Sequence, residues 1–239
     1  ALMQMITHGQ DLRYSEDRVV GARNFCNKLW NVTRFVVMNL QDAPAERIDL
    51  DAAELSLSDR WILSRHHRML ALVDRELEAY NIAQAADALY EHIWSEFCDW
   101  YVELAKADLY DPPTPERKAL TQEVLRTVLE GFLRALHPIM PFITEELWHR
   151  LDPEAGPIAV APFPRANEGR FDAEAEGRMG EMQGVVTAIR TLRAALTLAP
   201  SQRAPVTIIA DDDERRALLQ SQRGGISGLA MVSELELLG

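Results

Sequence analysis

The sequence predicts a mainly α-helical fold, in which an antiparallel helix bundle (residues 15–152) is followed by a small α+β unit (residues 173–239). Apolar residues recur at three- and four-residue spacing along several long segments, and short proline-containing links join these segments. After residue 172 one more helical pattern is followed by two short runs that alternate as strands do. The 239 residues, of which 47% are apolar, can bury one large core and a second, smaller one.

The first long helix is predicted at residues 16–40. Ser15 can serve as its N-cap, and Glu16 and Asp17 face the positive end of the helix dipole in the first turn. At 100° per residue one side of this helix is apolar and requires a core; it holds Ala22, Phe25, Leu29, Val32 and Val36.

Phe35 departs from this pattern, because it lies away from the apolar side on a stripe with Asn24, Lys28 and Asn31. Two interpretations are open for this ring. A second neighbouring helix could cover it, or it could be held beside Lys28 and Arg34 so that a nucleotide base stacks on it.

Four further helices complete the predicted bundle, at residues 59–80, 81–110, 116–136 and 144–151. Ser56 or Ser58 is the predicted N-cap of the first of these. Asn81 begins a capping-box pattern at the next, and Thr114 followed by a proline starts the third. Short links between long helices are typical of antiparallel neighbours.

The helix at 81–110 is apolar over more than half of its circumference, so we expect it to have neighbours on two sides. Trp94 and Trp100 are predicted to lie in the core. On the preceding helix His66 and His67 are adjacent and therefore point about 100° apart, which makes a shared metal ion unfavourable. We expect both histidines to be solvated at the surface.

Glu96 and Asp99 are three residues apart and resemble a catalytic carboxylate pair. Their place among aromatic residues on a long helix instead favours ion pairs with arginines of a neighbour, such as Arg23 or Arg65. The sequence contains no phosphate-binding glycine loop, no HExxH and no GxSxG. It therefore predicts no catalytic residues and no metal site.

Beyond the bundle, residues 153–172 are rich in proline and glycine and are predicted to form a linker with one edge strand at IAVA. The α+β unit then contains a helix at 173–198 with an apolar side, a strand at 204–210, a capped helix and a second strand at 231–238. The apolar side of its first helix includes Leu192 and Leu196.

The formal net charge is −12, which argues against a non-specific nucleic-acid binder and against DNA as a partner. Residues 1–40 nevertheless carry five basic and three acidic residues, so a polyanion would be expected to bind at the first helix. Cys26 and Cys98 have no metal-binding spacing and are expected to be free thiols in a reducing cytoplasm. No run of residues is long enough for a membrane span.

Three strings of residues resemble one family: ARNFCNKLWNVTRFV (22–36), SEFCDWYVELAK (95–106) and HPIMPFITEELW (137–148). They occur in this order in the part of valyl-tRNA synthetases that follows the catalytic domain. HPIMPFITEELW is shared with the isoleucyl and leucyl relatives of class Ia, whereas the other two strings are closer to the valyl enzymes. GQDLR (9–13) resembles the passage out of the catalytic domain, so residues 1–14 are expected to end the preceding catalytic or stem region.

This resemblance implies that the chain is a C-terminal fragment whose helix bundle binds the anticodon loop of valine tRNA. In the family, ATP-dependent attachment of valine uses HIGH and KMSKS motifs on a separate fold, and neither motif occurs here. The fragment is therefore expected to be inactive alone and to hold no cofactor, whereas the full-length enzyme would use ATP with Mg²⁺. Its small α+β unit would precede a coiled-coil arm that is absent from the chain.

The resemblance also implies which residues contact the anticodon loop. Phe35 corresponds to an aromatic ring that stacks on the middle anticodon base. One position departs from the family pattern, because some relatives have a basic residue where Asp17 stands and here the cation is Arg18. The expected contacts to tRNA are Arg13, Arg18, Lys28, Asn31, Arg34 and Phe35.

A different class of function is also open, namely a non-catalytic helical module that docks protein helices. An exposed apolar groove would favour that alternative, whereas a basic strip beside Phe35 on an acidic surface favours RNA. We expect a monomer in the cytoplasm with no membrane partner.

Overall fold

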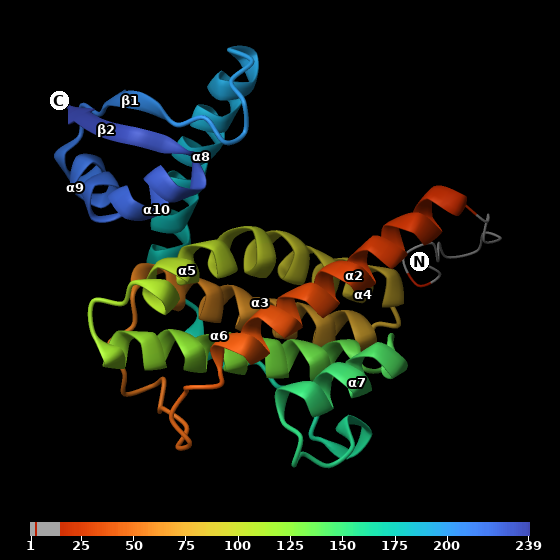
Figure 1. Ribbon diagram of the computed structural model, residues 1–239. Helices are drawn as coiled ribbons and strands as arrows, with labels where there is room; N and C mark the ends of the chain where they lie inside the picture. The colour runs from red at the N-terminus through yellow and green to blue at the C-terminus, as the bar shows by residue number, and fades with distance from the viewer. Residues whose placement is uncertain (1–2, 4–14) are drawn as a thin grey trace. The chain divides into compact units, whose positions relative to one another are not determined.

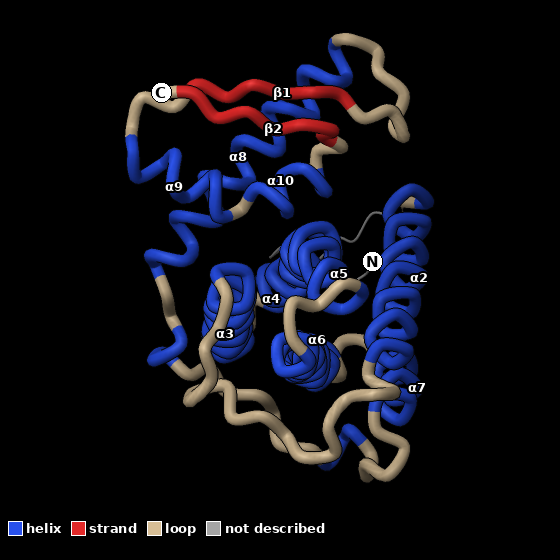
Figure 2. The backbone as a smooth tube through the Cα atoms, turned by 60° about the vertical axis from the view of Figure 1, so that its left-hand side comes forward, coloured by secondary structure: helices blue, strands red, loops and turns tan. Residues whose placement is uncertain are grey.

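The computed structural model describes Met3 and residues 15–239. It confirms the helical bundle, whose helices are α2 (Glu16–Asn39), α3 (Leu57–Glu78), α4 (Ile82–Glu91), α5 (Val102–Tyr110), α6 (Pro115–Leu136) and α7 (Pro141–Leu151) (Figure 1). Helix α6 packs against α2, α3, α4, α5 and α7. Figure 2 shows α3 and α6 nearly end-on and α2 side-on beside α6. The predicted fifth helix begins earlier than expected, because Pro141 occupies its first turn.

Helices α4 and α5 are joined without a break by a π-helical segment, His92–Tyr101. The predicted helix at 81–110 is therefore continuous, but its middle is wound differently. In a π-helix each backbone hydrogen bond spans five residues, as from the Val102 amide to the Phe97 carbonyl, so 100° per residue no longer assigns faces correctly. Phe97 and Tyr101 are fully buried, and the prediction that Trp94 and Trp100 lie in the core is wrong, since both are half-buried.

The helix caps agree with the sequence at two positions and differ at two. Ser56 and Asp59 form a reciprocal capping box on α3, and the Thr114 hydroxyl accepts from the Arg117 amide at 3.2 Å. Ser15 precedes α2 without a side-chain cap bond. The Asn81 side chain makes no cap bond either, because its amide instead donates to a Glu76 carboxylate oxygen at 2.9 Å.

A series of hydrogen-bonded polar side chains lies inside the bundle, although the sequence predicted histidines at the surface. His66 and His92 are both 2% exposed, and their rings meet at 3.1 Å between Nδ1 and Nε2. His92 Nδ1 contacts Glu96 Oε2 at 2.8 Å, and Arg65 Nε donates to the other oxygen of that carboxylate at 2.6 Å. The prediction for His66 is wrong because the 100° between adjacent residues turns one of the two rings into the core, while His67 is half-buried.

The acidic residues of the long helix pair as expected in one case and differently in the other. Glu96 pairs with Arg65, as the sequence suggested. Asp99 pairs with Lys28 of α2 and not with Arg23.

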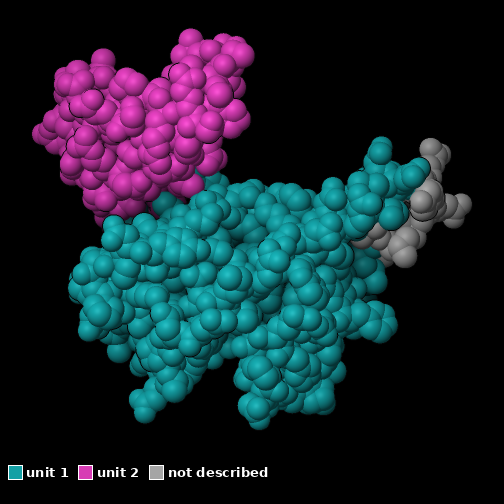
Figure 3. Space-filling view, in the orientation of Figure 1, with its two compact units in different colours: residues 1–172 teal, residues 173–239 magenta. Residues whose placement is uncertain are grey.

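Residues 153–172 form no strand; IAVA contains a single 3₁₀ turn at Ile158–Val160. This segment packs along α3, where Arg60 Nε donates to Asp172 Oδ2 at 2.7 Å and the Asp172 amide donates to the Ser64 hydroxyl at 2.8 Å. It accordingly belongs to the first of two compact units, residues 1–172 and 173–239, which Figure 3 distinguishes by colour.

The second unit confirms the predicted α+β pattern with α8 (Ala173–Ala195), β1 (Ala204–Ile209), α9 (Asp213–Ser221), α10 (Arg223–Leu229) and β2 (Val232–Leu238). Strands β1 and β2 pair in parallel, with Ala204 opposite Val232, because the two intervening helices provide the crossover. Leu192 and Leu196, expected on the buried side of the first helix, are 63% and 70% exposed at its C-terminal end.

Candidate nucleic-acid interface

The candidate interface is built on α2, whose buried side matches the sequence prediction. Phe25, Leu29, Val32 and Val36 are buried, and Ala22 is half-buried. This apolar side fixes the rotation of the helix and therefore the direction of every other residue on it.

Phe35 is half-buried, so part of its side chain is covered by the protein and part is accessible to solvent. Asn24 and Asn31, which share its stripe, are exposed. The Asn39 side-chain amide donates to the Phe35 carbonyl at 2.8 Å. An exposed amide one turn before a partly accessible ring is an arrangement that can contact both the edge of a base and its face.

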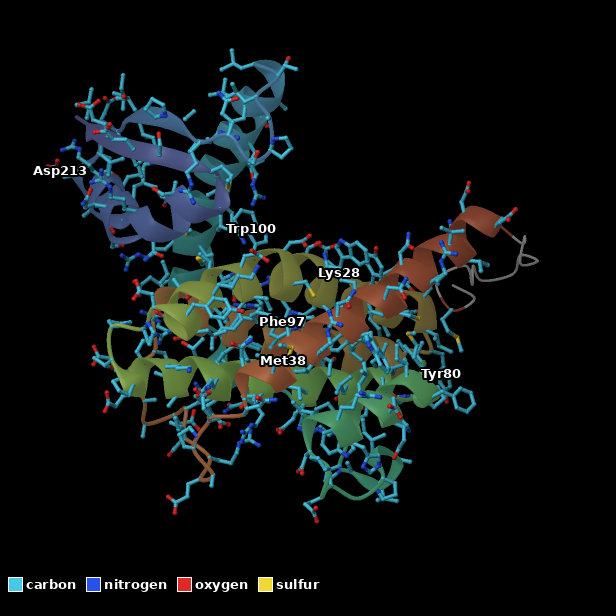
Figure 4. All side chains as sticks on the ribbon, viewed as in Figure 1. Lys28, Met38, Tyr80, Phe97, Trp100 and Asp213 are labelled. Carbon is cyan, nitrogen blue, oxygen red and sulfur yellow. The ribbon has the colours of Figure 1, made fainter. Side chains whose placement is uncertain are left out.

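Lys28 is engaged within the protein at the point where α2 meets the π-helical segment (Figure 4). Its Nζ lies 2.5 Å from an Asp99 carboxylate oxygen and 4.1 Å from the centroid of the Trp94 ring. The side chain is 25% exposed and that of Asp99 is 49% exposed. Lys28 is therefore paired with a carboxylate in the free protein, which the sequence did not predict.

Three stacked aromatic rings lie next to Lys28. Phe25 and Tyr90 lie 5.1 Å apart between ring centroids, and Tyr90 and Trp94 lie 5.4 Å apart, both in stacked orientation. Lys28 completes the series by its contact with Trp94. Such stacking restricts the Trp94 ring and places the Lys28 side chain against it.

Arg34 is exposed on the flank of α2 that faces α7, away from the Phe35 stripe. Arg18 is exposed near the start of α2, seventeen positions before Phe35 and so about 25 Å away along the helix axis. It cannot contact the same nucleotide as Phe35. Arg13 lies outside the described residues.

Sequence reasoning missed Trp30 and Arg150, which lie together at the crossing of α2 and α7. The Arg150 guanidinium carbon is 4.6 Å from the centroid of the Trp30 ring. Trp30 and Arg34 are four positions apart and could have been recognised as one helical stripe. Arg150 could not, because its approach depends on a contact between helices far apart in the sequence.

Two titratable groups in the core of the described bundle, His66 and Cys98, have shifted pKa values. Burial lowers the pKa of His66 well below its usual value, and His92 lowers it further. Burial raises the pKa of the Cys98 thiol to about 12, so the thiol stays protonated at neutral pH and is a poor nucleophile. Among the described residues, no cluster of three or more His, Cys, Asp or Glu side chains could hold a metal ion.

Comparison with known proteins gives one matching family model, the anticodon-binding domain of tRNA ligase, over residues 59–208. A valine–tRNA ligase of Syntrophotalea carbinolica is 39% identical over 236 residues, which cover 98% of this chain and 26% of that protein. The enzyme of Carboxydothermus hydrogenoformans with the same name is 43% identical over 224 residues, covering 94% of this chain and 25% of that protein.

The crystal structure of the Agrobacterium radiobacter agnB2 LeuRS–tRNA–LeuAMS ternary complex is similar in fold, with a TM-score of 0.52 and 20% identity. The similarity covers 72% of this chain and 19% of that one. The chain thus spans about a quarter of the length of the valine–tRNA ligases that it matches. Helix α2 precedes the residues matched by the family model but lies within the matches to these ligases.

Proposed function

Because the chain belongs to the family of anticodon-binding domains of tRNA ligases, we propose that it binds the anticodon loop of a valine tRNA. The observation that carries this proposal is Phe35, a half-buried ring on α2 beside the exposed Asn31. A ring fixed on one side and open on the other can stack on a base with little loss of its own conformational freedom.

The longer protein of which this chain would be a part is proposed to be a valine–tRNA ligase that uses ATP and Mg²⁺. Support comes from the valine–tRNA ligases that match nearly the whole of this chain. The HIGH and KMSKS motifs expected for valine activation are not in these residues. We therefore propose that the 239-residue chain contributes tRNA recognition and does not activate valine by itself.

We also propose that the protein works in the cytoplasm as a monomer. Cys26 and Cys98 are both free cysteines, which is typical of a reducing compartment. In the described part of the chain no helix is both long and apolar enough to cross a membrane.

The test is the affinity of the 239-residue chain for a valine tRNA transcript, with Phe35→Ala as the variant. Loss of one base–aromatic stack should weaken binding by about 5- to 150-fold, equivalent to about 1–3 kcal/mol. The helix should remain folded, because Phe25 and Leu29 hold its buried side.

Phe142→Ala is the matched control, since this phenylalanine is 91% exposed on another helix, α7. It should leave the affinity unchanged. If Phe35→Ala unfolds the bundle while the surviving folded fraction binds tRNA normally, Phe35 belongs to the core and the anticodon site lies elsewhere.

A further inference from the structure

A pocket of about 250 Å³ lies between α2 and α7, on the flank of α2 away from Phe35. Its volume is slightly below the range of roughly 300–1,000 Å³ that is usual for sites of drug-sized ligands, so it suits a group as small as one base. Six residues line it: Trp30, Thr33, Arg34, Val37, Leu147 and Arg150.

Thr33 is the unusual member of this set. It is fully buried, and its hydroxyl has no hydrogen-bond partner among the described residues. Three other helical threonines each donate to the carbonyl four residues earlier, at 3.1 Å, 2.8 Å and 2.9 Å: Thr121, Thr144 and Thr191. A buried hydroxyl without a partner costs stability, so a polar group from a ligand that enters the pocket would relieve this cost.

The rim of the pocket is positively charged and aromatic. The guanidinium of Arg150 stacks on the Trp30 ring, and its charge is partly balanced by Glu146, 2.6 Å away. Arg34 adds a second, exposed cation. Flat aromatic and guanidinium surfaces beside a free positive charge match the base and the phosphate of a nucleotide, whereas an apolar peptide would leave these charges unmatched.

We propose that this pocket holds one base of the bound RNA loop, with Thr33 contacting the base edge and Arg34 or Arg150 the phosphate. The inference rests on the proposed function and adds a second base-binding position to it. Trp30 and Phe35 are five positions apart and therefore point about 140° apart around α2. An RNA loop that reaches both straddles the helix, and Arg34 lies between them to meet the backbone of the loop.

The decisive variant is Thr33→Val, which keeps the shape of the side chain and removes only the hydroxyl. The stability of the bundle should stay the same or rise, because a buried group without a partner is lost. The affinity for valine tRNA should fall about three- to tenfold, the effect expected for one lost hydrogen bond. Thr191→Val, at a helical threonine of the other compact unit, is the matched control and should leave the affinity unchanged.

A second variant tests the cation independently. Arg150→Gln should weaken binding and reduce its salt dependence by about one phosphate contact. Arg178→Gln is its matched control, because Arg178 also pairs with a glutamate four residues earlier, Glu174, on a helix of the other unit. This control should not change the salt dependence.

The outcomes separate this inference from the proposed function. If Phe35→Ala weakens binding while Thr33→Val and Arg150→Gln do not, the pocket is not a base site and only this inference fails. If the unaltered chain does not bind valine tRNA at all, both fail. If single nucleoside monophosphates bind in the pocket and tRNA does not compete with them, the assignment to RNA is overturned.

Discussion

At the scale of single residues, Lys28 of α2 forms an ion pair with Asp99, and in the proposed RNA complex this carboxylate would compete with a phosphate for the lysine. Asp99→Asn should tighten tRNA binding several-fold, because it removes a nearby negative charge and frees Lys28 for a phosphate. The gain should shrink as salt is raised. Titrations of labelled tRNA at two salt concentrations measure both effects.

The matched control for this prediction is Glu103→Gln. Glu103 forms a similar exposed pair with Lys106, at 2.6 Å, one turn further along the same continuous helix. If Glu103→Gln improves binding as much as Asp99→Asn, the effect reflects total charge, and Lys28 has no particular role.

The residues of the site were only partly predictable. The stripe of Lys28, Asn31 and Phe35 followed from helical spacing, since the structure of α2 is regular throughout. Two contacts could not be predicted from helical spacing: the ion pair of Lys28 with Asp99 and the contact of Trp30 with Arg150. Each joins helices that are distant in the sequence. Helical periodicity predicts which residues share one face of a helix, but it does not predict which other helix packs against that face.

At the scale of elements, α3 and α6 pack closely at Gly131 of α6, where the absence of a side chain leaves room for His66 of α3. A Cβ atom there would lie 2.4 Å from His66 Nε2, and His66 is itself held by His92. Gly131→Ala should therefore destabilise the bundle by about 1–3 kcal/mol, despite the better helix propensity of alanine. All five tryptophans lie in the first unit, so tryptophan fluorescence during urea unfolding reports the bundle alone.

Gly21→Ala provides the comparison, because Gly21 lies in α2 and a Cβ atom there would meet nothing within 4 Å. It should stabilise the bundle by about 0.5–1 kcal/mol. Equal effects of the two substitutions would show that the packing of His66 against α6 is looser than described.

Most helices and strands could be predicted from the sequence, and the exception is the π-helical segment. Helix periods and caps located the long helices to within a few residues. The π-helical segment was not foreseen, because its residues satisfy an α-helical pattern equally well. The error moved two tryptophans, Trp94 and Trp100, from the expected core to half-buried positions.

At the scale of the whole molecule, acid should destabilise the bundle through His66. Burial, followed by the charges of His92, His67 and Arg134, lowers the pKa of His66 in the folded state. Below about pH 6.5 the unfolded chain takes up a proton that the folded protein does not, so stability falls as the pH falls. One such histidine contributes up to about 1.4 kcal/mol per pH unit.

Urea unfolding between pH 7 and pH 5 tests this pH dependence. His66→Gln should give a flatter dependence than the unaltered chain, although its stability at pH 7 is expected to be lower. Identical slopes for His66→Gln and the unaltered chain would contradict the role assigned to His66.

In the proposed function, the first helix of an acidic protein reads the anticodon of valine tRNA. The most direct measurement compares the dissociation constants of the 239-residue chain for a valine tRNA transcript and for the same transcript with its anticodon replaced. We predict at least about fivefold weaker binding of the replaced transcript, which corresponds to one lost hydrogen bond of about 1 kcal/mol. Equal dissociation constants for the two transcripts would show that the chain does not read the anticodon.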